Sequence, residues 1–235
     1  MRSPLFAESH AETQTSERFA LQSSKMLRVR LGPDVLATKG AMVAYQGRLT
    51  FEHQSAGGVG KFLKRALTGE AAPLMRVSGE GEAFFANEAA EIFLVTLEGD
   101  AISVNGRNLL AFDATCSWDI RRTQGAGVMA GLFNTIVSGQ GTVALSSDGS
   151  PMLLDCSRQP TFVDTNAAVC WSANLVPQLT SSLSMRSLLR GGSGEAFQYA
   201  FHGPGFVVVQ PSEGRPEPGS RSGGGGGFGF GNGGD

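Results

Sequence analysis

The sequence predicts an all-β fold in which three similar β motifs lie in one chain, in a pseudo-threefold arrangement with short helices between strands. Three observations predict it: many apolar runs have strand length, Gly, Asn, Asp or Pro separates them, and the tripeptide G-x-G recurs three times. Long amphipathic helices do not alternate with these runs, as they would in a parallel α/β protein. We therefore expect a sandwich or barrel-like body.

The chain divides into three regions. Residues 1–24 are polar and form a partly ordered lead-in that can donate one strand or short helix. Residues 25–212 form the three-repeat β domain, with repeats at about 25–90, 91–150 and 151–212. Residues 213–235 are rich in Gly, so we expect a flexible tail without a packed core.

Each expected strand is a run of β-branched, aromatic and aliphatic residues that ends at turn-forming residues. In chain order these runs span 26–31, 41–45, 48–53, 91–97, 101–104, 108–112, 142–146, 167–171 and 206–210. Three other stretches place apolar residues at i, i+3 and i+4, the spacing of one helix face. They predict short helices over 59–67, 127–133 and 181–189.

The G-x-G tripeptides define the repeat. They begin at residues 79, 139 and 203, so successive copies are 60 and 64 residues apart. An apolar strand precedes and follows each one, and an aromatic-ended strand lies upstream, at Tyr45, Phe112 and Trp171. We interpret each tripeptide as a hairpin turn, because primed turns need the positive φ angles that glycine adopts readily. The expected hairpin glycines are Gly79, Gly81, Gly139, Gly141, Gly203 and Gly205.

Several stretches resemble a known family. They read SGEGEAFFAN with EIFLVTLEGDAISVNGRNLLAFD, then GLFNTIVSGQGTVALSSDG, then PTFVDTNAAVCWSANL and HGPGFVVVQ. Over nearly all of residues 25–212 the chain resembles the bacterial relatives of the altered-inheritance-of-mitochondria proteins, formerly a domain of unknown function. The resemblance implies an all-β, TRAP-like fold, that of the tryptophan RNA-binding attenuation protein, and it supplies no catalytic residues. Mitochondrial members are linked to inner-membrane organisation, a role that transfers here only as an analogy, since no Arg-rich presequence is present.

Charge offers one candidate binding feature. The 19 Lys and Arg nearly balance the 21 Asp and Glu, which argues against nucleic-acid binding through bulk positive charge. Basic residues nevertheless recur at similar distances before each G-x-G. On a pseudo-threefold body they would form three equivalent patches for an anionic partner, or they are ordinary solvated side chains. These residues are Lys61, Lys64, Arg65, Arg121, Arg122, Arg186 and Arg190.

Other chemistry finds little support in the sequence. The three histidines are dispersed, so no metal site is expected, and the G-x-G loops lack the third glycine and following helix of a dinucleotide site. No cofactor is expected. The three cysteines form no C-x-x-C pair, and we expect reduced thiols in a cytoplasmic protein. Acidic pairs such as Glu80 with Glu82, and Asp113 with Asp119, are interpreted as solvated.

These patterns favour a non-enzymatic scaffold or binding module with an unknown protein partner. A small-ligand-binding protein with a cavity between sheets is one alternative. A protein peripheral to the membrane, bound to an anionic lipid surface, is another, because 59–67 combines apolar and basic residues. An enzyme is the least favoured class. A homo-oligomer stays open, since a neighbour can cover exposed sheet edges.

Overall fold

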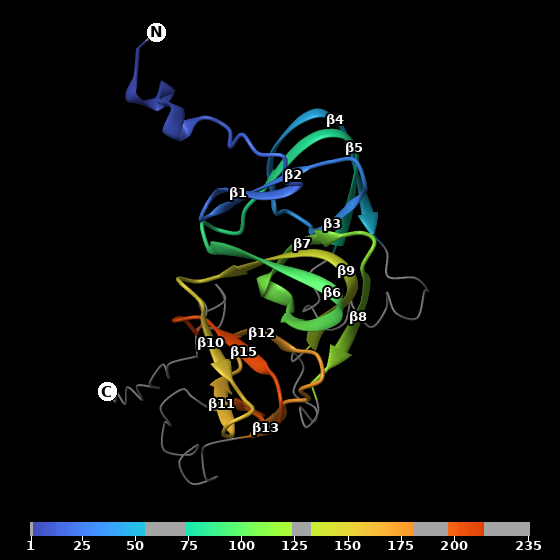
Figure 1. Cartoon of the computed structure of the whole chain (residues 1–235), viewed down its shortest axis with the longest axis vertical. Coiled ribbons are helices and arrows are strands. Elements are labelled where there is room, and N and C mark those ends of the chain that lie inside the picture. The colour runs from blue at the N-terminus through green and yellow to red at the C-terminus, as the bar shows by residue number, and fades with distance from the viewer. Residues whose placement is uncertain (1, 55–73, 124–132, 181–196, 214–235) are drawn as a thin grey trace, which may run out of the picture.

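The computed structural model describes residues 2–54, 74–123, 133–180 and 197–213, which are mainly β (Figure 1). The strands are β1 (Phe19–Ser23), β2 (Met26–Arg30), β3 (Val35–Thr38), β4 (Met42–Gln54), β5 (Leu74–Phe85), β6 (Glu91–Asn105), β7 (Leu109–Asp113), β8 (Ser117–Arg122), β9 (Phe133–Ser147), β10 (Met152–Asp155), β11 (Thr161–Asp164), β12 (Ala168–Ser172), β13 (Gln178–Thr180), β14 (Gln198–Phe201) and β15 (Phe206–Val209). Short 3-10 turns are η1 (Pro4–Phe6), η2 (Glu8–His10) and η3 (Gly106–Asn108). A search of these ranges finds no helix with the length and apolar character needed to span a membrane.

Every strand pairing among the described residues is antiparallel, and the all-β prediction is confirmed. Within the described ranges one 12-stranded sheet runs in the order β1-β2-β5-β3-β7-β9-β6-β12-β15-β10, while β4 pairs with β5 and β8 with β9. A second sheet of three strands has the order β11-β14-β13. The lead-in supplies β1, which pairs with β2.

Some predicted boundaries were wrong. The runs 41–45 and 48–53 belong to one strand, β4, and the runs 91–97 and 101–104 are joined in β6. In β6 the register shifts between Glu98 and Ala101, so an irregularity separates the two halves without reversing the chain. The helices predicted over 59–67 and 181–189 lie outside the described residues, as does 127–133 apart from Phe133, which begins β9.

Three consecutive sections of the chain share one pairing pattern. They are residues 26–85, 91–147 and 152–209, and each ends in a strand or strand pair that a G-x-G tripeptide divides: β5, β9, and β14 with β15. The part before the tripeptide pairs with β3, with the second half of β6 and with β11, respectively. The part after it pairs with β2, with the first half of β6 and with β10.

One further strand in each section, β4, β7 or β12, has a register shift at the same position. The aromatic residue of this strand lies opposite the residue two positions after the second glycine of the tripeptide: Tyr45 opposite Ala83, Phe112 opposite Val143, and Trp171 opposite Val207. The register then shifts at the same step in each strand, between Met42 and Ala44, between Leu109 and Ala111, and between Ala168 and Cys170. Equivalent β-bulges are therefore present in β4, β7 and β12.

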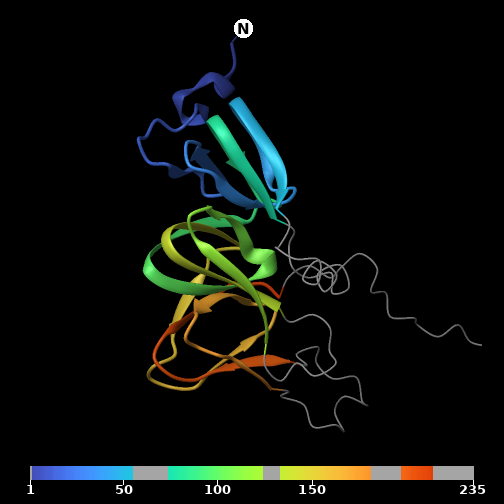
Figure 2. The same ribbon diagram turned by 90° about the vertical axis from the view of Figure 1, so that its right-hand side faces the viewer.

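Neighbouring sections are joined edge to edge. β3 of the first section pairs with β7 of the middle one, and β6 of the middle section pairs with β12 of the last. The sections therefore lie in a row, with β4 and β5 at one end and β11 and β13 at the other, as Figures 1 and 2 show.

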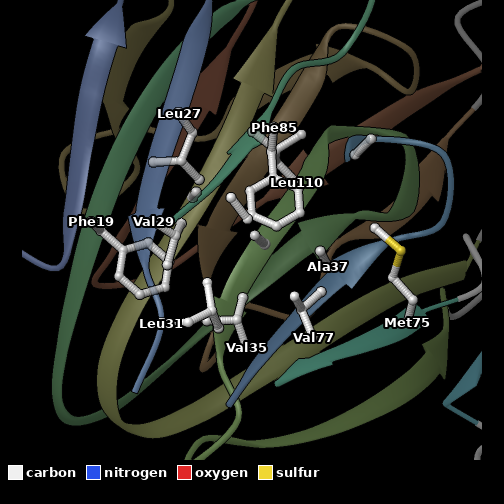
Figure 3. Packing of buried hydrophobic residues seen from close by; sticks show 14 of the residues in the cluster. Phe19, Leu27, Val29, Leu31, Val35, Ala37, Met75, Val77, Phe85 and Leu110 are labelled. Carbon is white, nitrogen blue, oxygen red and sulfur yellow. The ribbon is translucent and has the colours of Figure 1, made fainter. Parts of the chain in front are cut away.

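Each section contributes a hydrophobic cluster to the core. Figure 3 shows the first cluster, in which Leu27, Val29 and Phe85 pack together and Leu110 of the middle section joins them. The last cluster centres on Trp171, whose ring lies 5.6 Å from that of Phe201. Burying one such large side chain stabilises the fold by about 1.5–3 kcal/mol. Because clusters cross the section boundaries, burial holds the row together.

Candidate functional site

The G-x-G tripeptides bend strands and do not close hairpins. Two of them lie inside β5 and β9, and the third separates β14 from β15, which belong to different sheets. The hairpin prediction is therefore wrong, although the expected positive φ angles are present. They are 116°, 117° and 111° at the first glycine of the three tripeptides, and 146°, 155° and 147° at the second. The bend lets one chain segment leave one strand neighbour and join another.

Hydrogen bonds within the fold already occupy the backbone beside two of the bends. The Thr142 N–H donates to Asp113 Oδ2 over 2.8 Å, and the Phe206 N–H donates to Ser172 Oγ over 3.0 Å. Asp113 and Ser172 each follow the aromatic residue of their own section. These amides brace the bends, so they do not form the free amide row that a phosphate site needs.

Only part of the predicted basic set falls within the described residues. Arg121 lies on β8 and is exposed, and Arg122 ends the same strand. The remaining members lie outside the described ranges: Lys61, Lys64, Arg65, Arg186 and Arg190. In Figure 2 the strand ends that flank 55–73, 124–132 and 181–196 face one side of the row.

A buried arginine holds the lead-in on the sheet. Arg28 on β2 is only 2% exposed, and its guanidinium lies 2.7 Å from Glu82 of β5. The same group donates to the backbone oxygens of Thr15 and Glu17 over 3.3 Å and 3.1 Å. Arg30 adds a contact of 3.4 Å with Glu82. A guanidinium suits this task, because its fork of donors satisfies several acceptors at once.

A second group of charges links the residues just before β1 and β3, Arg18 and Asp34, with β5 and β7. Arg18 forms an ion pair with Asp113 and donates to the backbone oxygen of Pro33 over 2.6 Å. Burial lowers the pKa of Arg18 from its ordinary value, and the charge of Asp34 opposes this shift. Asp34 itself lies 2.8 Å from Arg76. The interpretation of Asp113 as solvated is wrong, and so is that of Glu82, because both carboxylates are paired with arginines.

The thiols sit in apolar surroundings. Cys116, Cys156 and Cys170 are free and buried. Burial raises the pKa of Cys170 to about 12, and burial also raises the pKa of Cys116. A thiol with a raised pKa stays protonated near neutral pH and is a poor nucleophile. Within the searched part of the chain no group of three His, Cys, Asp or Glu could hold a metal ion.

A buried amide network, which sequence reasoning missed, fastens the last strand. Asn108 Nδ2 donates to the Ser146 backbone oxygen over 2.8 Å and to Gln210 Oε1 over 3.1 Å. Gln210 Nε2 donates to the backbone oxygen of Asn166 over 3.2 Å. No sequence pattern indicated this network, because each amide residue stands alone in its local sequence and its hydrogen-bond partners are far away in the chain. The network joins the middle and last sections and shows no reactive group.

Large apolar side chains are exposed on strands at the ends of the row. They include Val43 and Tyr45 on β4 and Phe162 on β11. Sequence reasoning missed this feature also, because an apolar strand residue does not reveal whether its strand has one neighbour or two. Such exposed apolar sheet edges are typical of interaction surfaces.

Comparisons with known proteins bear on the same ranges. A family model described as mitochondrial biogenesis AIM24 matches residues 19–212. The crystal structure of a protein from Streptococcus pyogenes is similar with a TM-score of 0.66 and 21% sequence identity, and the match covers 82% of this chain and 91% of that one. No curated protein matches the sequence. The structural likeness supports the fold, and it carries no activity with it.

Proposed function

The chain belongs to the mitochondrial biogenesis AIM24 family, and on that premise we propose that it is a non-enzymatic scaffold or binding module made of three β repeats. The repeats are the sections 26–85, 91–147 and 152–209. Their shared bends, bulges and pairing order support this proposal. The pseudo-threefold relation then takes the form of three equivalent sections in a row.

Several of the described side chains that could take part in catalysis are engaged in structural contacts or buried, which supports the non-enzymatic part of the proposal. Arg28, Glu82 and Asp113 are engaged in ion pairs that hold strands and the lead-in together. The three thiols are buried, and Gln210 is committed to a network that joins two sections. An active site needs reactive groups that converge on a substrate, whereas these groups converge on one another.

The partner surface in this proposal is the side of the row on which the strand pairs that flank 55–73, 124–132 and 181–196 end. Equivalent strand pairs, β4–β5, β8–β9 and β13–β14, flank the three segments in which most of the predicted basic residues occur. Arg121 and Arg122, the last two residues of β8, are the described members of the set, and Arg121 is exposed. The ends of all three strand pairs that flank these segments lie on one side of the row in Figure 2, which supports a shared surface. We therefore expect a negatively charged protein partner to bind there.

Charge reversal in the full chain tests the protein-partner function. One variant carries Lys61→Glu, Arg121→Glu and Arg186→Glu, one change in each repeat. The matched control carries Lys39→Glu, Arg48→Glu and Arg158→Glu, which changes the net charge equally at exposed residues elsewhere. Crosslinking in the host followed by mass spectrometry should recover one partner with the wild type and control, and lose it with the first variant. Equal recovery with both variants would refute the proposed surface.

Membrane binding is a second candidate, favoured by the composition of 59–67, where Phe62 and Leu63 are flanked by Lys61 and Lys64. Flotation with vesicles of phosphatidylcholine and phosphatidylglycerol, compared with phosphatidylcholine alone, tests it. Each basic residue near an anionic surface contributes about 1 kcal/mol, so three reversals should weaken binding on the order of 100-fold or more. Flotation that is equal on both vesicle types would exclude an electrostatic membrane role.

A further inference from the structure

The two junctions between sections have the same register. At the first, Leu36 of β3 lies opposite Phe112 of β7. At the second, Ser103 of β6 lies opposite Trp171 of β12. On its other side, Leu36 lies opposite Arg76 of β5, and Ser103 lies opposite Ile136 of β9. Arg76 and Ile136 are each three positions before the first glycine of the tripeptide in their section. The junctions are therefore two copies of one strand-to-strand interface.

Each end of the row presents one half of this interface without its partner. Phe162 of β11 faces Ala200, three positions before Gly203, so it occupies the place that Leu36 and Ser103 hold. Tyr45 of β4 occupies the place of Phe112 and Trp171. Among the strands that the structure describes, β11 pairs only with β14, and residues 42–46 of β4 pair only with β5.

Exposure distinguishes the two ends from the junctions. Phe162 and Tyr45 are 56% and 49% exposed, while their four counterparts in the junctions are at most 2% exposed. Val43, on the same edge of β4, is also exposed. The lead-in borders this edge, since Gln46 donates a hydrogen bond to Glu12, yet it leaves Tyr45 accessible. The ends lie at opposite extremes of the row in Figure 1, so one chain cannot pair them with each other.

We propose that a second copy of this chain covers each open edge, with β11 of one copy antiparallel to residues 42–46 of the next. The register of the internal junctions fixes that of the contact. Phe162 lies opposite Tyr45, Val163 opposite Ala44, and Thr161 opposite Gln46. Such a contact joins two different surfaces, so copies associate head to tail and form a closed ring or a longer row. This inference is independent of the proposed basic partner surface.

The chain itself argues for a second copy as the occupant. Its two junctions already show that a strand of the β11 type pairs with a strand of the β4 type in one register. Both halves of the third junction are present on every molecule, and both carry a large apolar side chain at its centre. Edge strands with unpaired backbone groups add further strands readily when register and side chains match.

Native mass spectrometry of the full chain tests this proposal. The wild type should form multiples of its 24.6 kDa mass that increase with concentration. Tyr45→Lys and Phe162→Lys should each abolish association, because a charge would be buried at the contact. Met152→Lys, at a residue of similar exposure on β10, is the matched control and should associate as the wild type does.

Mixing the two variants distinguishes head-to-tail pairing from other modes. The Tyr45→Lys protein keeps an intact β11 edge, and the Phe162→Lys protein keeps an intact β4 edge. An equimolar mixture should therefore form a dimer with one copy of each and nothing larger, which also shows that both variants are folded. A wild type that stays monomeric, variants that associate as the wild type does, or a mixture without the mixed dimer would each overturn the proposal.

Discussion

Gly81 shows how one residue fixes a bend of β5. Its φ of 146° is rare for residues with a side chain, and an added Cβ would lie 2.0 Å from the backbone oxygen of Gln46. Gly81→Ala should therefore lower the free energy of unfolding in urea by roughly 1–3 kcal/mol more than Gly99→Ala. Gly99 has a φ of 100° with no atom within 4 Å of its added Cβ, so it isolates the backbone effect. Equal losses in the two variants would contradict the close approach.

The buried guanidinium of Arg28 gives a second test. Glu82→Gln removes its charge partner, and a buried charge left without compensation costs about 3 kcal/mol of stability. Asp155→Asn is the control, because its partner Arg158 is exposed and the pair is open to water. Urea unfolding should show a large loss for Glu82→Gln and little change for Asp155→Asn. If both variants retained wild-type stability, the cluster would not anchor the lead-in.

Cys170 links stability to alkaline pH. Burial raises its pKa in the folded state to about 12 from the ordinary value of 9.0. Its contribution to the unfolding free energy is therefore complete below pH 9 and declines between pH 9 and pH 12. Over this window the unfolded chain releases the thiol proton and the folded chain does not, with a slope of up to about 1.4 kcal/mol per pH unit. The unfolding free energy of Cys170→Ala should fall less steeply than that of the wild type between pH 8.5 and 10.5. Identical slopes would show that the thiol ionises in the folded protein.

β1 is the element that ties the lead-in to the sheet. It places Phe19 in the first cluster, and the segment before it supplies the backbone oxygens that Arg28 binds. Removing residues 2–10 should leave the midpoint of thermal unfolding nearly unchanged, because that stretch contributes no residue to the core. Removing residues 2–24 should lower it markedly or yield insoluble protein. A stable, soluble product of the longer truncation would show that β1 is dispensable.

The most apolar strands were predictable from the sequence, whereas their neighbours were not, and neither were the strands β3, β8, β10, β11 and β13. Runs such as 108–112 and 206–210 alternate or cluster apolar residues strongly enough to predict a strand wherever they pair. A glycine with positive φ, however, fits a turn and a bend inside a strand equally well, and Gly79 and Gly139 proved to be the latter. Only the register of β5 and β9 against their neighbours separates the two cases.

The candidate site was less predictable than the strands, because its contacts join distant residues. Arg28 and Glu82 are 54 residues apart, and Asn108 and Gln210 are 102 apart. Neither separation follows a local period of 2 or 3.6 residues, so no sequence pattern marks these pairs. Phe162 lies in a short apolar run that resembles a core strand. It is exposed because its strand, β11, lies at the end of the row.

The whole molecule is a row of sections whose internal junctions repeat. Hydrophobic clusters extend across both junctions, as Leu36 and Val169 in the middle cluster show. Family membership and the likeness to the Streptococcus pyogenes structure extend over the same strands. The row has a direction, because β4 lies at one end and β11 at the other. The exposed edges of β4 and β11 therefore lie at opposite ends of the molecule.

Amide hydrogen exchange at two protein concentrations tests whether the ends of the row are unfilled copies of its junctions. Peptides that cover β3, β7 and β12 should be protected at both concentrations, since their partners lie in the same chain. Peptides that cover residues 42–46 and 161–164 should exchange quickly in dilute solution and become protected together at high concentration. Protection of these two edges that does not depend on concentration, or a concentration-dependent change elsewhere in the chain, would contradict the account.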